Sequence, residues 1–367
     1  MDGEVIVVGG GVVGCAIAYY LARQGASVTV VERGELAGEA SGAAAGMLAP
    51  LAEAHGPGSF LDLCLASLAL FPSLARDLAE VTGLDIGYRP CGLLRVALSP
   101  EQEEALRGRL RWQQGTGLPL LWLTGEEARA MEPALSPRVR AAVLSPREAQ
   151  VEPRPLAQAL AAAARGMGAR FLLSTPVLGI VGRGRRVLGV RTPGGVLRGG
   201  QVVVAAGPWT GRLLEGIGLR LPTPPRRGQM LAYRGRPLQR IVWGPQGYLV
   251  PKEGDTTYVG ATVEAVGFRC RTTVRGLASL RRLARTLVPA LGRAEVVSAW
   301  AGLRPGSPDG LPIIGPLPGW QGLSVASGHF RNGILLAPIT GRLLAQALAG
   351  QPTDLPLAPF SPARFLG

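Results

Sequence analysis

The sequence is poor in side chains that bind metals or attack substrates. Its 367 residues include two histidines and four cysteines, and no two cysteines have the spacing CxxC. A structural zinc site needs four such ligands close together, and a disulfide scaffold needs a high density of cysteines in a short chain. We therefore predict neither a metal site nor a disulfide framework, and we expect a reducing, cytoplasmic location.

Lysine and asparagine are almost absent, and one residue of each remains. Lys252 is the only lysine and Asn332 the only asparagine, while arginine supplies nearly all of the positive charge. Such a bias is typical of GC-rich codon usage, and heat-adapted proteins also avoid asparagine. Asn332 precedes a glycine in SGHFRNGILLAP, so it is either a leftover turn residue or a residue kept for a function.

Long runs of positive charge are also missing, although the formal net charge is +14. Net charge is the one feature that favours a nucleic-acid partner. The arginines are scattered and no aromatic residues alternate with them, so the sequence argues against such a partner.

Residues 5–22 carry no charge, but they contain four glycines and no positively charged segment precedes them. These features argue against a spanning helix or a signal peptide, so we expect no membrane partner.

The amino terminus carries the pattern of a nucleotide-binding unit. The stretch EVIVVGGGVVGCAIAYYLARQGASVTVVER predicts a buried strand over 4–8, a glycine turn, a helix over 12–24 and a second strand that ends at Glu32. An acid at the end of the second strand accepts hydrogen bonds from ribose hydroxyls. The negative charge of Glu32 would repel the 2′-phosphate of an NADP-type dinucleotide, so we expect a dinucleotide without that phosphate.

Three glycines in the turn have the spacing GxGxxG. Gly9 allows the tight turn, Gly11 lets the backbone approach a pyrophosphate, and Gly14 lets the helix pack closely on the strand. The helix N-terminus offers free amides to the phosphates. The small residues of GEASGAAAGMLAP, over 38–50, suit a segment that lies against a flat ring, which favours FAD over NAD.

The rest of the chain predicts further helices and a second sheet. Alternating polarity between residues 226 and 265 indicates strands, and a very apolar strand over 202–205 suits the centre of a sheet. No linker or repeat separates the domains, so they must interleave. The predicted helices cover 59–81, 98–114, 152–168, 271–291 and 332–349, with a short one opened by a capping box of Thr124 and Glu127.

Seven motifs occur in order along nearly the whole chain: GGGVVGCAIAYYLA, VVERG, SGAAAGML, STPV, VVAAGPW, WAGLRPGSPDGLPIIG and SGHFRNGILLAP. Together they resemble the D-amino acid oxidase family of flavoproteins, and most closely its glycine oxidases of thiamine biosynthesis. The resemblance implies a mixed α/β fold. A Rossmann-like FAD-binding domain (1–85, 145–215 and 300–367) would be interleaved with a substrate domain (86–144 and 216–299) built on a large mixed or antiparallel sheet.

The resemblance also implies FAD and the residues that bind it. No cysteine follows Cys270 in the sequence, so we expect the FAD to be bound without a thioether link to the C-terminal flavin-contacting segment. Asn332 is a favoured N-cap residue, and the helix that begins there would direct its amides at the flavin edge that gains negative charge on reduction. The implied cofactor-binding residues are Gly9, Gly11, Val12, Val13, Gly14, Glu32, Arg33, Ala40, Ser41, Ala45, Gly46, Met47, Val177, Gly207, His329, Phe330, Arg331, Asn332, Gly333, Ile334 and Leu335.

Three residues are implied to hold the substrate. Arg304 corresponds to the arginine that binds the substrate carboxylate, Tyr248 to a tyrosine whose hydroxyl lies over it, and Arg331 lies close by. From the residues alone, an interface ion pair is the favoured interpretation of Arg304, a core position that of Tyr248 and a surface charge that of Arg331, because charged residues lie mostly on surfaces. The matching motifs reverse this preference. Gln246 and Val263 fall at pocket positions where relatives carry other side chains. Glycine, sarcosine and small D-amino acids therefore stay open as substrates.

The implied reaction is FAD-dependent oxidation of glycine by O2, which gives an imine, its oxo acid and hydrogen peroxide. It needs no metal and no nucleophile, because the cofactor carries the redox step. Two alternatives stay open: a dehydrogenase that passes electrons to a quinone or another acceptor, and a tRNA-modifying FAD oxidoreductase. The resemblance further implies a homo-oligomer, specifically a tetramer.

Overall fold

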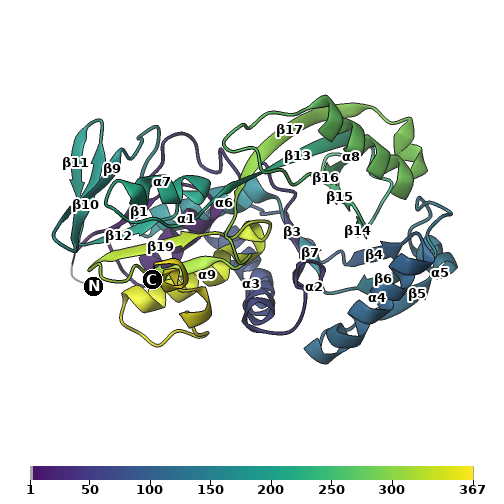
Figure 1. The fold of residues 1–367 in the computed structure, drawn as a ribbon, viewed down its shortest axis with the longest axis horizontal. Coiled ribbons are helices and arrows are strands. Elements are labelled where there is room, and N and C mark those ends of the chain that lie inside the picture. The colour runs from purple at the N-terminus through teal and green to yellow at the C-terminus, as the bar shows by residue number, and fades with distance from the viewer. Residues whose placement is uncertain (1–2, 367) are drawn as a thin grey trace.

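The computed structural model describes residues 3–366, and its elements form two lobes side by side (Figure 1). One lobe is built on a six-stranded sheet and the other on an eight-stranded sheet. The helices are α1 (Val12–Arg23), α2 (Pro50–Glu53), α3 (Ser59–Thr82), α4 (Pro100–Gln113), α5 (Gly125–Met131), α6 (Pro153–Gly166), α7 (Thr210–Glu215), α8 (Val274–Leu287) and α9 (Gly333–Leu348).

The six-stranded sheet is parallel except at one edge strand, β18. Val5 and Val7 of its strand β1 pack against helices α1 and α9, while Ile6 and Val8 face the opposite core. Because both faces are covered, every residue of β1 is buried and apolar, as parallel sheets require. The strand order is β18 (Ile313–Pro316), β19 (Leu323–Ser327), β12 (Gln201–Val204), β1 (Val5–Val8), β2 (Val28–Val31) and β8 (Arg170–Leu172).

A small antiparallel sheet packs on the second face of this parallel sheet. It consists of β9 (Gly179–Arg183), β10 (Arg186–Thr192) and β11 (Gly195–Arg198). The chain turns between β10 and β11 at Pro193–Gly194, where the sequence predicts a hairpin turn.

The eight-stranded sheet is mixed, with a parallel pairing between β14 and β4. Its strands alternate between two environments. Leu231 and Tyr233 of β13 face the core beneath α8, whereas Met230 lies beside Tyr248 on the opposite face. The order is β17 (Val296–Pro305), β13 (Pro225–Arg234), β16 (Thr256–Gly260), β15 (Gly247–Lys252), β14 (Ile241–Gly244), β4 (Leu93–Ala97), β6 (Ala141–Ser145) and β5 (Leu121–Thr124).

The predicted mixed α/β fold is confirmed. All strands of the parallel sheet lie within 1–85, 145–215 and 300–367, and β17 crosses residue 300 from one predicted domain to the other. The capping box of Thr124 and Glu127 is present at the start of α5. Strand β14 lies within residues 226–265, where strands were predicted, whereas strands β4, β5 and β6 of the same sheet were not predicted.

One described helix, α3, is long and apolar enough to cross a membrane by length and composition. It packs against α9 and α6, and its residues Leu63, Phe71 and Leu78 are fully buried in the largest core cluster. Within residues 3–366, α3 is therefore a core helix of the first lobe.

Candidate active site

A cavity of about 540 Å³ lies where the two sheets meet. Val8, Val31 and Ser327 line it from the carboxyl ends of strands in the parallel sheet, and Met230 and Tyr248 line it from the eight-stranded sheet. Ligands of open α/β sheets bind beyond the carboxyl ends of the strands. Almost all sequence-predicted site residues line this cavity: Gly9, Gly11, Val12, Val13, Glu32, Arg33, Ala40, Ser41, Ala45, Gly46, Met47, Val177, Gly207, Tyr248, Arg304, His329, Phe330, Arg331, Asn332, Gly333 and Ile334.

Two predicted residues do not line the cavity. A Cβ on Gly14 would lie 1.9 Å from the carbonyl oxygen of Gly9, so Gly14 lets α1 approach β1, which is the packing role that the motif predicts. Leu335 points into the core with 1% of its surface exposed. Both residues support the cavity wall from behind.

One end of the cavity has the geometry of a ribose and diphosphate site. The Glu32 carboxylate accepts hydrogen bonds from the backbone N–H of Gly10 (2.6 Å) and of Gly34 (2.9 Å), which hold it at the end of β2. The Ser41 hydroxyl accepts a hydrogen bond from the N–H of Val12 at 3.0 Å, so it lies at the N-terminus of α1. Gly9 has φ +115°, a conformation that glycine tolerates.

The same end carries an aromatic cluster that the sequence did not predict. The Arg33 guanidinium lies 3.7 Å from the ring centroid of Trp209, and Arg212 lies 3.7 Å from that of Phe268. The rings of Trp209 and Phe268 are 5.5 Å apart. Trp209 closes the VVAAGPW motif, and that tryptophan after an apolar strand was the available signal.

The loop that follows β19 crosses the middle of the cavity. Burial lowers the pKa of His329 to about 4, so its ring is neutral near pH 7, and its Nε2 lies 3.0 Å from the Thr340 hydroxyl. Phe330 has φ +49°, an uncommon conformation for a bulky residue. Its N–H donates to the carbonyl oxygen of Pro305 at 2.8 Å, which ties this loop to the end of β17.

Asn332 corrects one detail of the sequence analysis. It occupies the N-cap position of α9, as predicted, but its side chain makes no capping hydrogen bond. Its backbone φ and ψ of −101° and 9° are not the extended values of a capping residue, so the side chain does not reach back over the first turn. Instead Asn332 is buried and lines the cavity. The first amides of α9 therefore remain free to face a ligand.

Arg304 lies at the other end of the cavity, flat against β13. Its Nη1 donates to the carbonyl oxygen of Thr262 at 3.0 Å. A Cβ on Gly228 would lie 2.2 Å from the same nitrogen, so a side chain there would displace the guanidinium. Burial lowers the pKa of Arg304, and burial raises the pKa of the neighbouring Tyr248, which therefore keeps its hydroxyl proton. The two side chains form a cationic pocket with a neutral donor beside it.

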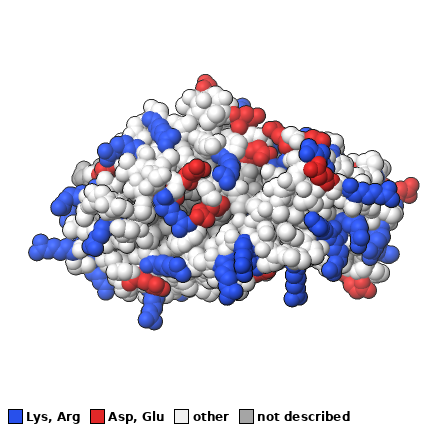
Figure 2. Space-filling view, turned by 90° about the horizontal axis from the view of Figure 1, so that it is seen from above, with Lys and Arg blue, Asp and Glu red and all other residues white. Residues whose placement is uncertain are grey.

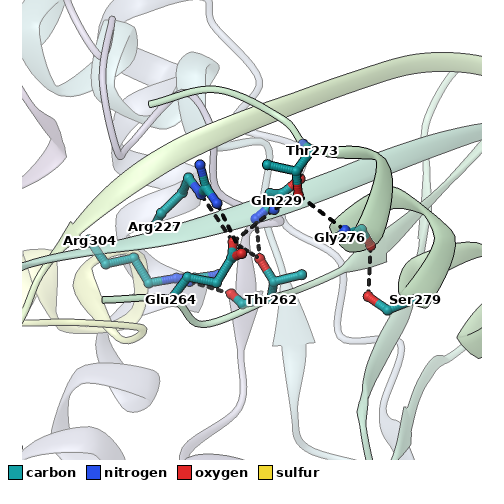
Figure 3. A network of polar contacts seen from close by, with 8 residues as sticks. All are labelled: Arg227, Gln229, Thr262, Glu264, Thr273, Gly276, Ser279 and Arg304. Atoms are coloured by element: carbon teal, nitrogen blue, oxygen red, sulfur yellow. Dashed lines mark hydrogen bonds and ion pairs between the residues drawn. The ribbon is translucent and has the colours of Figure 1, made fainter. Parts of the chain in front are cut away.

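A polar network holds Arg304 from behind (Figure 3). The Glu264 carboxylate accepts two hydrogen bonds from Arg227 (3.0 and 2.9 Å) and one from Thr262 (2.9 Å). Arg227 thereby holds the pKa of Glu264 at about 2. The network continues through Gln229 to the cap of α8. Thr262 thus links Arg304 to a charged pair that stays ionised at any ordinary pH.

Glu53, at the end of α2, is a cavity residue that the sequence analysis missed. Its Oε1 pairs with Nε of Arg331 at 2.9 Å, and 13% of the Glu53 side-chain surface is exposed. The Arg331 guanidinium also lies 5.1 Å from the ring centroid of Trp243. Arg331, predicted near the substrate, is therefore already paired. The acid stands three residues beyond the quoted GEASGAAAGMLAP stretch, which was read only as a flavin contact.

Two predicted pocket residues lie elsewhere. Gln246 is exposed in the turn between β14 and β15, and Val263 has 49% of its surface exposed. Neither lines the cavity. The two-residue turn points Gln246 outward, so the expected effect of these residues on substrate choice is not supported. No cluster of three or more metal-ligating side chains occurs among residues 3–366.

Comparison with known proteins shows the family to which this chain belongs. Residues 4–347 match the model of the DAO family, described as FAD dependent oxidoreductase. The chain belongs to this family. It is 40% identical to a glycine oxidase from Geobacillus kaustophilus over 99% of this chain and 97% of the relative. It is also 38% identical to a bifunctional protein ThiO/ThiG from a Nostoc species, over 99% of this chain and 55% of that protein.

A solved structure agrees with the sequence comparison. The crystal structure of glycine oxidase from Geobacillus kaustophilus superposes with a TM-score of 0.95 at 39% identity, covering 100% of this chain and 99% of that one. The cofactor of this FAD-dependent oxidoreductase is FAD, as predicted.

The residues present fit FAD. Gly9 and Gly11 line the cavity at the N-terminus of α1, where free amides stabilise a pyrophosphate. A Cβ on Gly9 would lie 2.5 Å from the carbonyl oxygen of Ala205, so glycine is needed for this close approach of the chain. A Cβ on Gly46 would lie 2.0 Å from the carbonyl oxygen of Val151, so the small-residue segment runs close to the wall and leaves the cavity open. Glu32 stands where ribose hydroxyls would donate to it. Met47 and the amino end of α9 line the cavity between its nucleotide end and Arg304, and these residues would border the flavin ring.

Proposed function

We propose that this FAD-dependent oxidoreductase oxidises glycine to its imine, with O2 as the electron acceptor and hydrogen peroxide as the second product. The observation that carries the proposal is the partly buried Arg304, which lines the cavity with Tyr248 and has no carboxylate partner among the described residues. An unpaired guanidinium fork in a buried pocket matches a carboxylate in two parallel hydrogen bonds. The similarity to glycine oxidases over the full chain supports glycine as the substrate.

The side chains act by binding and orienting the substrate. FAD supplies the redox step, in which a hydride leaves the substrate carbon. Arg304 holds the carboxylate and Tyr248 donates a hydrogen bond to it, so the remaining groups of a small amino acid point toward the flavin. Fixing the reacting carbon in this way converts binding energy into rate. The positive charge of Arg304 also favours the neutral amine, which is the form that gives up hydride.

The supply of glycine imine for thiazole synthesis is the metabolic role that fits best. The similarity to a bifunctional ThiO/ThiG protein supports it, since 99% of this chain aligns with 55% of that protein, and the same chain is similar to glycine oxidases over its full length. We infer a cytoplasmic location from the absence of disulfides among the four cysteines. We also propose a homo-oligomer, a tetramer by family resemblance, which light scattering on the purified protein would test.

The alternative functions have separate tests. A dehydrogenase would be bleached by glycine under nitrogen but would regain its colour slowly in air, with little peroxide. A tRNA-modifying enzyme would retain tRNA at physiological salt. Basic side chains gather at the right-hand end of the face shown in Figure 2, but acidic side chains lie beside them, and no basic groove crosses that face, so we favour the oxidase.

Substitution of Arg304 tests the proposed function. Lysine keeps the charge but loses the planar fork. Loss of a charge-assisted hydrogen bond costs roughly 1.5–3 kcal/mol, or about tenfold to a hundredfold in kcat/KM. We expect Arg304→Lys to fall by this amount on glycine and Arg304→Ala to fall further, with FAD content unchanged in both.

Methylamine, which is glycine without its carboxylate, is the control substrate. Its kcat/KM should be nearly the same in the wild type and in both variants, because it does not use the fork. Retention of the wild-type value for glycine in Arg304→Ala would mean that the carboxylate is bound elsewhere, and the amino-acid oxidase assignment would lose its basis.

A further inference from the structure

The substrate end of the cavity holds more charge than one carboxylate requires. Arg304 and Arg331 are both cations that line it, and Glu53 is the anion. Burial is the main cause that lowers the pKa of Arg304. The charge of Arg331 lowers this pKa further, and the charge of Glu53 raises it. With Arg331 paired to Glu53, one cation is left for a substrate.

The position of Glu53 is set by the structure around it. Helix α2 is one turn long, and its backbone forms hydrogen bonds with the buried side chains of Glu148 and Gln113 and with the partly buried side chains of Arg95 and Arg109. The Glu148 carboxylate accepts from two of its amides at 2.8 and 3.2 Å, and Arg95 and Arg109 each donate to its carbonyl oxygens at 2.6 Å. Gln113 donates to it as well, at 2.7 Å. A turn held in this way places the Glu53 carboxylate opposite Arg331 without relying on a mobile loop.

Arg331 is held on its own side too. It extends from the loop before α9, its guanidinium lies over the ring of Trp243, and that ring lies 5.3 Å from the ring of Tyr248. The ion pair of Glu53 and Arg331 therefore stands next to the tyrosine that contacts the substrate. Both charged side chains line the same cavity as Arg304 and Tyr248, so a longer substrate held at Arg304 would meet them.

We propose that Glu53 is a specificity-determining residue that occupies Arg331 and so restricts the site to amines with one carboxylate. The inference rests on the proposed function in one respect, namely that Arg304 holds the first carboxylate. A substrate with a second carboxylate must displace Glu53 from Arg331, so the largely buried Glu53 carboxylate loses its ion-pair partner while two further anions lie beside it. The nearby cations Arg95 and Arg109 already donate to carbonyl oxygens of α2. Like charges and an unpaired buried ion both oppose this arrangement.

Two ligands that lack an amine, and so cannot be oxidised by the enzyme, measure how strongly the site excludes a second carboxylate. Ethoxyacetate and diglycolate share the same ether oxygen and the same first carboxylate, and diglycolate carries a second carboxylate where ethoxyacetate ends in a methyl group. Their dissociation constants are measured on the FAD-loaded protein from the change in the flavin absorbance spectrum. The wild type should bind ethoxyacetate at least about tenfold more tightly than diglycolate, the size of one charge-assisted contact.

Three variants complete the test. Glu53→Gln keeps the size of the side chain but removes its charge, so Arg331 becomes available and the preference for ethoxyacetate should fall by about tenfold or more. The double variant Glu53→Gln with Arg331→Gln should regain the wild-type preference. Glu103→Gln, which removes a carboxylate paired with Arg107 on α4, is the matched control and should leave the ratio unchanged.

Each outcome is decisive. A ratio that stays the same in Glu53→Gln, or that stays low in the double variant, would overturn the role of Glu53 while leaving the proposed function intact. Failure of the wild type to bind ethoxyacetate would instead overturn the carboxylate site at Arg304, and the proposed function and this inference would fall together.

Discussion

At the scale of single residues, the rare side chains of this protein are found at structured positions. Lys252, the only lysine, is buried and donates to the carbonyl oxygens of Ala45 (3.2 Å) and Val151 (2.9 Å) and to Glu152 (2.8 Å). A compact ammonium with three separate acceptors is a geometry that a planar guanidinium does not reproduce. Because Ala45 lines the cavity, Lys252 supports the flavin segment from behind.

Asn332 leads to a prediction at the same scale. Its side chain lines the cavity at the amino end of α9 and makes no capping bond. A carboxylate there opposes the negative charge that a flavin gains on reduction. Asn332→Asp should therefore lower the two-electron reduction potential by roughly 30 mV or more, which corresponds to about 1.4 kcal/mol.

Asn332→Ser is the paired control and should leave the potential nearly unchanged. Titration against dyes of known potential measures both variants. Equal potentials in the two variants would show that this side chain does not face the flavin.

At the scale of elements, the short helix α2 depends on a buried acid from another segment. Burial raises the pKa of Glu148 to about 7, although two backbone amides, Arg95 and Arg109 act in the opposite direction. Its second oxygen, Oε2, has no hydrogen-bond partner, and neither has the buried hydroxyl of Ser145. The two atoms line a cavity of about 10 Å³, close to the space that one water needs.

The raised pKa predicts a pH dependence of stability. Between the unfolded value of about 4.5 and the folded value of about 7, the folded protein binds the proton more tightly than the unfolded chain does. The contribution of Glu148 to the free energy of unfolding therefore falls as pH rises through this window, by roughly 3 kcal/mol in total.

Glu148→Gln removes this titration and keeps an oxygen that accepts from α2. Urea unfolding at saturating FAD should show wild type losing stability relative to Glu148→Gln between pH 4.5 and 7.5. The exposed substitution Glu104→Gln serves as the reference for a general change in charge. A constant difference between wild type and Glu148→Gln across this range would contradict the prediction.

At the scale of the whole molecule, the cofactor joins the two lobes. The cavity is lined by residues of the parallel sheet and of the eight-stranded sheet, so bound FAD adds contacts to both. A ligand that binds the folded state alone stabilises it by RT ln(1 + [L]/Kd), about 2.7 kcal/mol at a hundredfold excess over Kd. Removal of FAD should therefore lower the melting temperature by several degrees.

The same arrangement predicts that FAD is bound without a covalent link. None of the cysteines lines the cavity; Cys15 and Cys64 are buried in the core, and burial raises the pKa of both thiols. Acid precipitation should release all of the yellow colour into the supernatant. Flavin that stayed on the denatured chain after washing would contradict this prediction.

Local sequence patterns determined the elements of this protein. The glycine spacing, the apolar run of β1 and Glu32 at the end of β2 specified the nucleotide-binding unit, because turn geometry and strand burial depend on neighbours within about 30 residues. The capping box at Thr124 was readable for the same reason. The family motifs then indicated Arg304 and Tyr248 by position, before any contact between them could be derived.

Only the tertiary structure decided how charges meet at the substrate end. Glu53 and Arg331 are separated by 278 residues along the chain and pair at 2.9 Å because α2 and the loop before α9 face the same cavity. The uncapped side chain of Asn332 and the raised pKa of Glu148 likewise result from contacts between segments that are distant in the sequence. The desolvation and ion pairing of a side chain depend on its neighbours in space, and those neighbours cannot be read from the order of residues along the chain.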